Sequence, residues 1–371
     1  MAKQKIRYGV VGLGHISQIA VLPAFKHADE NSELTALISS DPEKLKTLSE
    51  TYRINSKNCY SYEQYDEAMA NDAFDAVYIA LPNDMHKDFT VKAANAGKHI
   101  LCEKPMAPTT SDCREMMNAA ESNNVKLMIA YRLHFEKTNM LAVEMIKAGK
   151  IGEPRLFNST FSLQVREGNI RTKEDRAGGP LNDIGIYCIN ACRYLFQDEP
   201  SEVVSMFAQG TDERFNEIEE SCSAIMRFPN ERLGSFSCSF GAKDVSRFEI
   251  VGTEGRILLE PAYDYAVELE YVVESGKHTE RHKTPKRDQF APELVYFSNC
   301  ILNDTPPEPS GLEGIADMQI MEAIKESARS GQVVKLGKRD LDQMNPSGKQ
   351  IQQKPAIKKP PMINVESGSR D

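Results

Sequence analysis

Short apolar runs alternate with helical patterns over the first 130 residues. The apolar runs cover residues 7–11, 34–38, 76–81, 99–102 and 126–130, and helical patterns cover residues 15–26, 88–96 and 111–122 and begin again at residue 42. Parallel strands are covered by helices on both faces, so they read as nearly continuous apolar runs. This alternation predicts an α/β fold with a Rossmann dinucleotide-binding domain over residues 1–130.

The pattern changes to period-two alternation after about residue 150. Strand candidates are residues 157–163, 203–208, 221–228, 233–240, 248–251, 256–259 and 267–273, followed by helices near 292–302 and 315–330, the second ending at Gly331. Such alternation is typical of antiparallel strands with one packed face. We expect an α+β domain over residues 131–340, with a large, mostly antiparallel open sheet that serves substrate binding and oligomerisation. The uncovered face predicts a homodimer or homotetramer.

Residues 341–371 are rich in Pro and Lys and poor in apolar residues. Such a composition cannot form its own core. We expect a C-terminal tail, which either wraps a neighbouring subunit or is disordered, and the composition favours a disordered end.

Composition and charge exclude several classes of protein. The longest apolar run, residues 76–81, is far short of the roughly 18 residues that span a bilayer, so we expect no membrane insertion. The 45 basic and 54 acidic residues give a net charge of −9, which disfavours nucleic acid as a partner. The first apolar strand leaves no room for a signal peptide, so we expect a cytoplasmic protein.

The histidines and cysteines predict no metal site. The eight cysteines contain no CxxC pair, and several lie in apolar or alternating stretches that suit buried thiols in a reducing compartment. Cys188 and Cys192 are four residues apart on a predicted helix, but no third or fourth zinc ligand lies near them.

A degraded glycine-rich fingerprint follows the first strand and opens the first helix. Its residues are Gly12, Leu13, Gly14, His15, Ile16 and Ser17. Gly12 permits a tight turn, and Gly14 lets a pyrophosphate approach the backbone at the positive end of the helix. Ser17 replaces the third glycine and is small enough for close packing. The position between strand and helix predicts a phosphate-binding loop.

The end of the second strand indicates which dinucleotide binds. A carboxylate there would bind the ribose hydroxyls of NAD and repel a 2′-phosphate. The strand instead ends in Ser39 and Ser40, and Asp41 is interpreted as a helix N-cap ahead of Pro42. Two hydroxyls, a helix N-terminus and Lys44 suit a 2′-phosphate. We therefore expect NADP as the cofactor, with NAD less favoured.

Glu103 and Lys104 follow the strand at residues 99–102. Ligands of open parallel sheets bind outside the carboxyl ends of the strands, where nicotinamide and substrate would meet. A lysine there can stabilise negative charge that develops on a substrate oxygen. Leu81, Asn83 and His86 follow the preceding strand and are expected to frame the same crevice, although His86 suits a structural role equally well.

Asp183 and Tyr187 lie four residues apart on the helix predicted at residues 181–195, so they share a face. Gly185 between them would let a ligand approach the backbone. Oxidation of an alcohol needs a proton acceptor, and a free tyrosine, with a pKa of about 10, needs a nearby ammonium to act as one. We hypothesise that Tyr187 is the acid/base group, Lys104 its electrostatic partner and Asp183 the residue that orients the substrate; a packing tyrosine is the alternative.

These motifs resemble the glucose–fructose oxidoreductase / inositol dehydrogenase / MocA family, and within it the glucose–fructose type. The likeness extends from about residue 5 to 335, and its motifs are residues 12–14, 81–83, 96–99, 102–106, 131–132 and 178–187. The resemblance implies a Rossmann domain, an open-sheet domain for oligomerisation, and sugar or polyol substrates. Ser39, Ser40 and Lys44 resemble the 2′-phosphate site of the glucose–fructose type, although a serine–glycine pair is serine–serine here. We expect this chain to differ from the periplasmic enzyme of this type in lacking its long export signal.

Other cofactor contacts are expected from the resemblance. By analogy with the same type, Tyr62 would stack on the adenine, and Arg132 would line the pocket beside Tyr131; packing roles suit them as well. Among His134, Arg171 and Lys173 the residues offer no means to choose a substrate contact.

Three alternatives stay open at this point. The protein is either an NADP-dependent sugar oxidoreductase or a catalytically silent NAD(P)-sensing regulator of the same fold, and Lys104, Asp183 and Tyr187 together favour the enzyme. A diol or biliverdin-type reductase of the same family would differ in the pocket. If NADP stays bound between half-reactions, one sugar is oxidised and another reduced; if it exchanges, the enzyme is a simple dehydrogenase.

Overall fold

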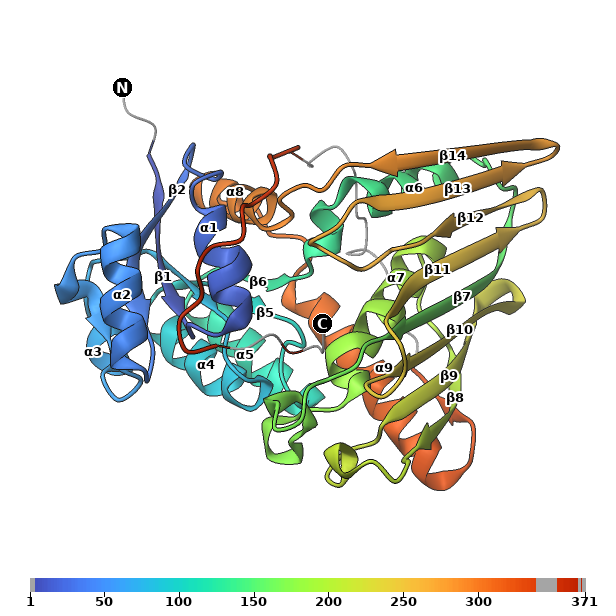
Figure 1. Cartoon of the computed structure of the whole chain (residues 1–371), viewed down its shortest axis with the longest axis horizontal. Helices are drawn as coiled ribbons and strands as arrows, with labels where there is room; N and C mark the ends of the chain where they lie inside the picture. Colours follow the sequence, from blue (N-terminus) through green and yellow to red (C-terminus); the bar gives the residue numbers. More distant parts are fainter. Residues whose placement is uncertain (1–3, 338–351, 366–367, 369–371) are drawn as a thin grey trace. The chain divides into compact units, whose positions relative to one another are not determined.

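The computed structural model describes residues 4–337, 352–365 and 368, which form two compact units (Figure 1). One unit holds residues 4–135, 288–315 and 352–365, and the other holds residues 136–287, 316–337 and 368. These units differ from the domains expected at residues 1–130 and 131–340, because two later segments return to the first unit.

The first unit is built on a six-stranded parallel sheet in the order β3-β2-β1-β4-β5-β6. Its strands are β1 (Ile6–Val11), β2 (Ser32–Ile38), β3 (Cys59–Tyr60), β4 (Ala76–Ile79), β5 (His99–Glu103) and β6 (Leu127–Ala130). All four residues of β4 are fully buried, as their continuous apolar run predicts. The strand order is that of a Rossmann domain, and the predicted fold class is confirmed.

Helices connect these strands, and one helix from late in the chain joins them. They are η1 (Ser17–Val21), α1 (Leu22–Ala24), α2 (Pro42–Tyr52), α3 (Tyr65–Met69), α4 (His86–Asn95), α5 (Thr110–Ser122) and α8 (Phe290–Leu302). On α8, the hydroxyl of Ser298 lies 2.7 Å from that of Tyr8 and 2.8 Å from that of Ser32. These buried hydrogen bonds tie α8 to β1 and β2, which is why residues 288–315 belong to this unit.

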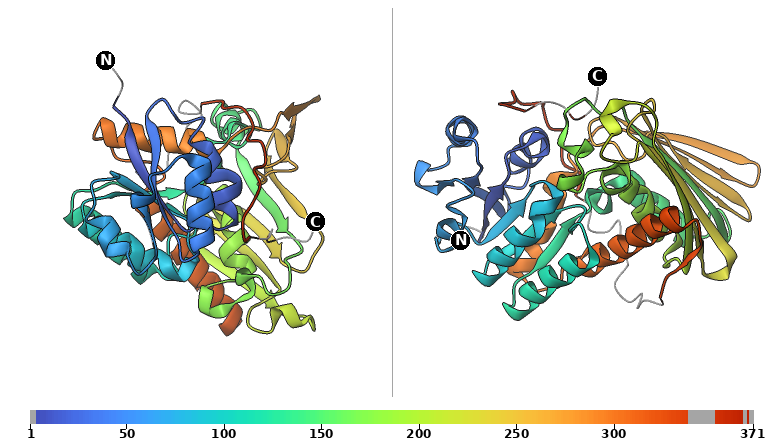
Figure 2. Two further views of the ribbon diagram at one scale, coloured as in Figure 1. Left: turned by 60° about the vertical axis from the view of Figure 1, so that its left-hand side comes forward. Right: turned by 90° about the horizontal axis from the view of Figure 1, so that it is seen from below.

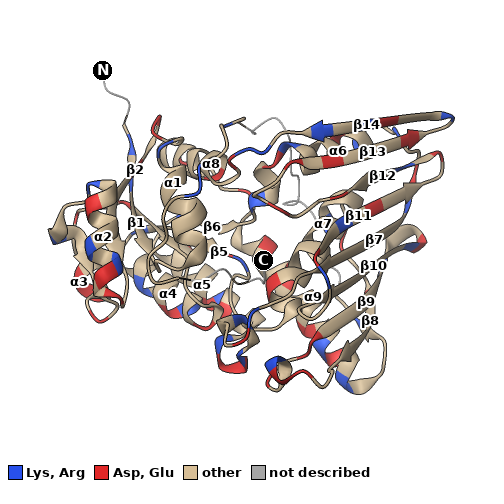
Figure 3. Ribbon diagram, viewed as in Figure 1, with Lys and Arg blue, Asp and Glu red and all other residues tan. Residues whose placement is uncertain are grey.

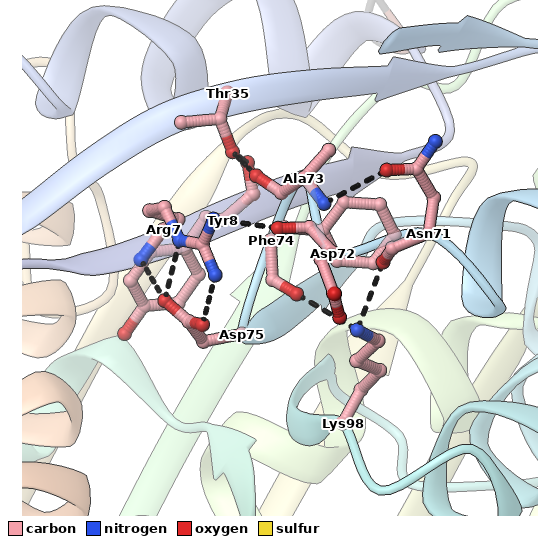
Figure 4. A network of polar contacts seen from close by, with 9 residues as sticks. All are labelled: Arg7, Tyr8, Thr35, Asn71, Asp72, Ala73, Phe74, Asp75 and Lys98. Carbon is pink, nitrogen blue, oxygen red and sulfur yellow. Dashed lines mark hydrogen bonds and ion pairs between the residues drawn. The ribbon is translucent and has the colours of Figure 1, made fainter.

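A polar network fixes the amino-terminal end of this sheet (Figure 4). Arg7 binds Asp75 through Nε at 3.0 Å and Nη2 at 2.6 Å, and Lys98 donates to the carbonyl oxygens of Asn71 and Phe74 at 3.0 Å each. Lys98 belongs to one of the motifs that carry the family resemblance. Its contacts fix the loop before β4, at the sheet end opposite to the predicted cofactor loops.

The second unit contains a nine-stranded sheet in the order β14-β13-β12-β11-β7-β10-β9-β8-β15. Its strands are β7 (Pro154–Ser162), β8 (Glu202–Ala208), β9 (Ser221–Phe228), β10 (Arg232–Ser239), β11 (Val245–Gly252), β12 (Gly255–Leu259), β13 (Leu269–Ser275), β14 (His278–Thr284) and β15 (Val334–Lys335). Only β7 and β10 pair in parallel, so the expected mostly antiparallel sheet is confirmed.

Helices cover one face of this sheet (Figure 2). They are α6 (Lys137–Lys147), α7 (Ile186–Phe196) and α9 (Gly311–Ser330), of which α9 begins in the first unit. On the covered face, the hydroxyl of Ser205 donates to the carbonyl of Ile324 on α9 at 2.6 Å. On the other face, Val204 and Ile225 face each other across β8 and β9 and are 38% and 48% exposed. That face is open, and its exposed apolar side chains lie among polar ones such as Ser223 and Ser237.

Residues 352–365 lie on the first unit. Lys354 Nζ is 2.8 Å from Glu30 Oε2, and the backbone N–H of Ile363 donates to Gln18 Oε1 at 2.8 Å. The expectation of a disordered end is therefore wrong for these residues, because their backbone and side-chain groups find partners on this unit. The other residues of the expected tail lie outside the described part of the chain, apart from Gly368.

Charges of both signs are interspersed along the elements of both units (Figure 3). Within the described ranges, the helices are too short or too polar to cross a bilayer. The same residues bring no three His, Cys, Asp or Glu side chains together in the way that a metal ion requires.

Candidate functional site

The residues expected to bind the cofactor all follow strands of the parallel sheet. Residues 12–16 follow β1, Ser39 and Ser40 follow β2, Tyr62 follows β3, Leu81, Asn83 and His86 follow β4, Glu103 and Lys104 come at the end of β5, and Arg132 follows β6. The carboxyl ends of parallel strands meet at one edge, where open α/β sheets bind ligands. The first unit thus gathers this set at a single sheet edge, and contact of each residue with a cofactor stays a prediction.

The turn after β1 requires glycine at position 12. Gly12 has φ +91°, and a Cβ there would lie 2.4 Å from the carbonyl oxygen of Ala80. A Cβ at Gly14 would meet nothing within 4 Å, so the backbone there is open to a ligand. Ser17 is fully buried, and its hydroxyl donates to the carbonyl of Gly12 at 2.5 Å. A serine in place of the third glycine therefore braces the turn from within, and the loop fits a diphosphate.

Asp41 caps the helix that follows β2, as its interpretation as an N-cap predicts. Its Oδ1 accepts from the backbone N–H groups of Glu43 at 2.9 Å and Lys44 at 3.1 Å. The hydrogen bond from the Lys44 backbone contributes most to lowering the pKa of Asp41. Ser39 accepts from the backbone N–H of Asp41 at 3.2 Å. The carboxylate of Asp41 thus binds the N–H groups at the N-terminus of α2, where a negative charge is stabilised.

Glu103 is held beside Lys104 at the end of β5. The hydroxyl of Tyr78 donates to Glu103 Oε1 at 2.9 Å. Burial raises the pKa of Glu103, and the charge of Lys104 opposes that shift most strongly. Lys104 is half-buried, and its peptide bond to Pro105 is cis.

A second buried carboxyl lies behind this motif, on α8. Glu293 is fully buried, and burial together with the charge of Glu103 raises its pKa well above the ordinary value, while Arg132 opposes the shift. Arg132 is itself buried and donates to Gln289 Oε1 at 2.5 Å. The sequence interpretation missed Glu293; its signal was a carboxylate inside the apolar pattern of residues 290–297.

His86 joins two loops of the sheet edge. Its side chain has no exposed surface, and its ring nitrogens lie 2.9 Å from the carbonyl oxygens of Pro105 and Leu81. Burial lowers the pKa of His86, although these carbonyls oppose the shift. A neutral ring donates to one of the two. These contacts fasten the loop after β4 to the segment that carries Lys104, which is a positioning role.

Tyr62 lies between β3 and α3. Its ring meets that of Phe89 edge-on, with centroids 5.6 Å apart, and it is half-buried. Burial raises the pKa of its hydroxyl to about 12. The ring is thus fixed by aromatic packing, and its stacking on an adenine stays a prediction.

Asp183 and Tyr187 come from the second unit. The predicted helix begins with a π-helical turn, η7 (Leu181–Gly185), which carries Asp183 and leads into α7 with Tyr187. Asp183 Oδ2 lies 2.8 Å from Nε of Arg171, which follows β7 on a short helical turn, η5 (Ile170–Thr172). Tyr187 is half-buried, and its ring meets that of Phe161 edge-on at 5.6 Å. Arg171 is thus the partner of Asp183, and contact of Arg171, His134 or Lys173 with a substrate stays a prediction.

Gly185 packs against the sheet, which differs from the expectation that it admits a ligand. A Cβ there would lie 3.1 Å from Cys238 Sγ on β10 and 3.1 Å from Leu181 Cδ1. The residue is buried. The small side chain is explained by close contact between helix and sheet.

The chain is similar to known proteins over most of its length. Residues 6–131 match a family model described as "Oxidoreductase family, NAD-binding Rossmann fold", and residues 140–258 match the "GFO/IDH/MocA C-terminal domain". A D-xylose 1-dehydrogenase [NADP(+)] of Haloarcula marismortui is 31% identical over 344 residues, covering 89% of this chain and 93% of that protein. A D-xylose 1-dehydrogenase (NADP(+)) 2 of Haloferax volcanii is 28% identical over 335 residues, covering 89% and 99%.

A solved structure is similar over nearly the same length. The crystal structure of an aldose–aldose oxidoreductase from Caulobacter crescentus, complexed with glycerol, matches with a TM-score of 0.86 and 34% identity. The match covers 90% of this chain and all of the other.

Proposed function

Because the chain belongs to the Gfo/Idh/MocA family of oxidoreductases, we propose that it is an NADP-dependent enzyme that transfers hydride between the nicotinamide and the anomeric carbon of an aldose. The observation that carries this proposal is the set of strand-end residues at the parallel sheet, which fits a dinucleotide. The substrate class rests on two relatives whose names state NADP-dependent oxidation of D-xylose and on one named for aldoses.

NADP is the cofactor that the loop after β2 suits. The exposed Ser40, the buried Ser39 and the ammonium of Lys44 can bind a 2′-phosphate, while the Asp41 carboxylate is occupied as a helix cap. The turn at Gly12 and Gly14 offers backbone N–H groups to the diphosphate. When bound, NADP⁺ supplies a ring carbon that accepts hydride.

Lys104, Asp183 and Tyr187 are the residues that we assign to the chemistry. In the direction of oxidation, Tyr187 takes the proton of the sugar hydroxyl, and the Lys104 ammonium stabilises the negative charge that develops on the oxygen. Asp183 accepts a hydrogen bond from the sugar, and the ion pair with Arg171 holds its carboxylate in one orientation. Glu103 and His86 position the segment that carries Lys104.

We further propose a homo-oligomer that buries the open face of the nine-stranded sheet. Exposed apolar side chains lie on its neighbouring strands, namely Leu156, Val204, Met206, Ile225 and Leu233, of which Met206 is 77% exposed. A second copy is the common cover for such a face. Sedimentation of the wild type and of Ile225→Lys should give an oligomer and a monomer, respectively; a monomeric wild type would contradict the proposal.

The activity test uses the full chain and the absorbance of NADPH at 340 nm. NADP⁺ is mixed with a panel of aldoses, ketoses and polyols, and NAD⁺ is compared at equal concentration. We expect NADPH to form with at least one aldose and NAD⁺ to be the poorer acceptor. Binding of NADP⁺ without turnover of any sugar would support a regulatory sensor instead.

A further inference from the structure

The C-terminal segment 352–365 runs beside the first helix of the Rossmann domain (Figures 1 and 2, dark red). It is fastened near its start, where Lys354 Nζ lies 2.8 Å from Glu30 Oε2 and the Lys354 carbonyl accepts from the backbone N–H of Asp288 at 3.4 Å. Its far end reaches two segments that we expect to surround the dinucleotide.

The first of these segments is the glycine turn, which Gln18 connects to the tail. The amide Nε2 of Gln18 donates to the carbonyls of Leu13 and Ile363, both at 2.9 Å, and its Oε1 accepts from the Ile363 N–H at 2.8 Å. Gln18 is only 1% exposed, so these bonds are shielded from water. One side chain thus joins the backbone of the tail to the backbone of the phosphate loop.

The second segment is the start of α2. The side-chain amide Nδ2 of Asn364 donates to Asp41 Oδ2 at 3.1 Å and to Glu43 Oε2 at 2.9 Å. Asp41 Oδ1 is already used by the helix cap. The carboxylates of Asp41 and Glu43, which follow Ser39 and Ser40 in the chain, therefore each accept a hydrogen bond from the tail. The amide donor partly offsets their negative charge.

We propose that Asn364 is a specificity-determining residue of the dinucleotide site. By binding Asp41 and Glu43, it weakens the repulsion that these carboxylates exert on a 2′-phosphate, and so favours NADP over NAD. The adjacent residues Ile363 and Asn364 link the phosphate loop to the start of α2, where we expect the 2′-phosphate. We therefore expect the tail to slow release of the dinucleotide as well. This inference rests on the proposed NADP dependence.

Point variants of the full chain test the inference. Asn364 is exposed and has φ +49°, where alanine would be strained, so Asn364→Gly removes the amide without opening a core or straining the backbone. We expect its dissociation constant for NADP⁺ to rise about three- to tenfold, as loss of charge-assisted hydrogen bonds implies, while that for NAD⁺ stays within twofold. Asn364→Asp places a third carboxylate beside the other two, and its affinity for NADP⁺ should fall further.

Release is measured by stopped-flow fluorescence of NADPH. Ile363→Pro removes the N–H that donates to Gln18 Oε1, and we expect the dissociation rate to rise at least about threefold. Lys354→Ala is the matched control, because it removes a tail contact at Glu30, far along the segment from Asn364. Its NADP⁺ to NAD⁺ affinity ratio should equal that of the wild type.

The outcomes separate the inference from the function on which it rests. An unchanged affinity ratio in both Asn364 variants, with thermal melting at the wild-type temperature, overturns the role of Asn364. Equal loss of affinity for NADP⁺ and NAD⁺ also overturns it, because that result indicates general loosening. Failure of the wild type to bind either dinucleotide overturns the proposed function itself.

Discussion

Arg171 Nε lies 2.8 Å from Asp183 Oδ2, and this ion pair joins the turn after β7 to the helical turn that precedes Tyr187. The side chains are 36% and 19% exposed, so the pair is only partly shielded from water. The ion pair therefore serves mainly to orient Asp183, because a planar guanidinium fixes the direction of a carboxylate better than a flexible ammonium does.

Replacement of Arg171 should impair catalysis through Asp183. We expect Arg171→Met to lower kcat/KM for the aldose about 10- to 100-fold and Arg171→Lys to recover part of the loss, because charge without a fork positions the carboxylate less well. In the Asp183→Ala background, Arg171→Met should have little further effect.

Lys173→Met is the matched control, because Lys173 directly follows the same turn but binds Glu217. Additive effects of the Arg171 and Asp183 substitutions would contradict a positioning role for Arg171.

Tyr187 and Lys104 should affect turnover more than cofactor binding. We expect Tyr187→Phe and Lys104→Met each to lower kcat about 10²- to 10⁴-fold, because each removes a group that handles the proton or the oxygen charge. The affinity of Tyr187→Phe for NADP⁺ should stay within twofold of the wild type. Tyr271→Phe, on β13, serves as the control, since its ring stacks on His282. A near-normal kcat of Tyr187→Phe rejects the acid/base assignment.

The sequence predicted the Rossmann domain well because its strands are buried on both faces. Residues 76–81 form an unbroken apolar run, and all of β4 is buried. Strand β14 was missed for the opposite reason: every residue of His278–Thr284 is polar, and six of the seven are exposed at the sheet edge. Charged residues on an edge strand oppose pairing with other chains. The same residues remove the apolar–polar alternation by which a strand is recognised in a sequence.

The candidate site was predicted in part. Residues after strand ends could be placed from connectivity alone, since that edge follows from the fold. Partners distant in sequence could not: Arg171 with Asp183, Glu293 behind Glu103, and Asn364 with Asp41 are all tertiary contacts. The sequence also could not distinguish a glycine that leaves room for a ligand from one that allows a helix to pack closely on a sheet. Gly185 allows close packing on the sheet.

Two glycines of the phosphate loop should respond differently to alanine. Gly12→Ala meets a positive φ and a backbone oxygen at 2.4 Å, so we expect it to lower the free energy of unfolding by at least about 2 kcal/mol. Gly14→Ala meets open space, so it should melt within a few degrees of the wild type yet bind NADP⁺ less tightly. Wild-type affinity of a folded Gly14→Ala would argue against a diphosphate at this turn.

The Arg7–Asp75 pair should control acid stability without affecting activity. Burial alone would raise the pKa of Asp75, but the hydrogen bonds and charge of Arg7 outweigh it, so the pKa lies below its ordinary value. In the unfolded chain that pKa returns to about 3.9. The stabilisation is therefore complete above that value and is lost as the pH falls through the lower pKa of the folded state.

Asp75→Asn should then lower the free energy of unfolding at pH 7 by about 1 kcal/mol, a value reduced because the two side chains are 34% and 41% exposed. The difference from the wild type should shrink as the pH falls below 4, and kcat should be unchanged at pH 7. Denaturant unfolding at several pH values measures this. A difference that grows toward acid pH would contradict the assigned direction of the shift.

The most direct test of the proposed function is whether hydride passes from the anomeric carbon of an aldose to NADP⁺. D-xylose labelled with deuterium at the anomeric carbon is incubated with the full chain and NADP⁺, and the NADPH formed is analysed by mass spectrometry. We expect deuterium on the nicotinamide ring, and a slower reaction than with unlabelled sugar if hydride transfer limits the rate. With Tyr187→Phe we expect little or no NADPH and little or no oxidised sugar. Tight NADP⁺ binding with no labelled NADPH from D-xylose or from any other anomerically labelled aldose would contradict the proposed function.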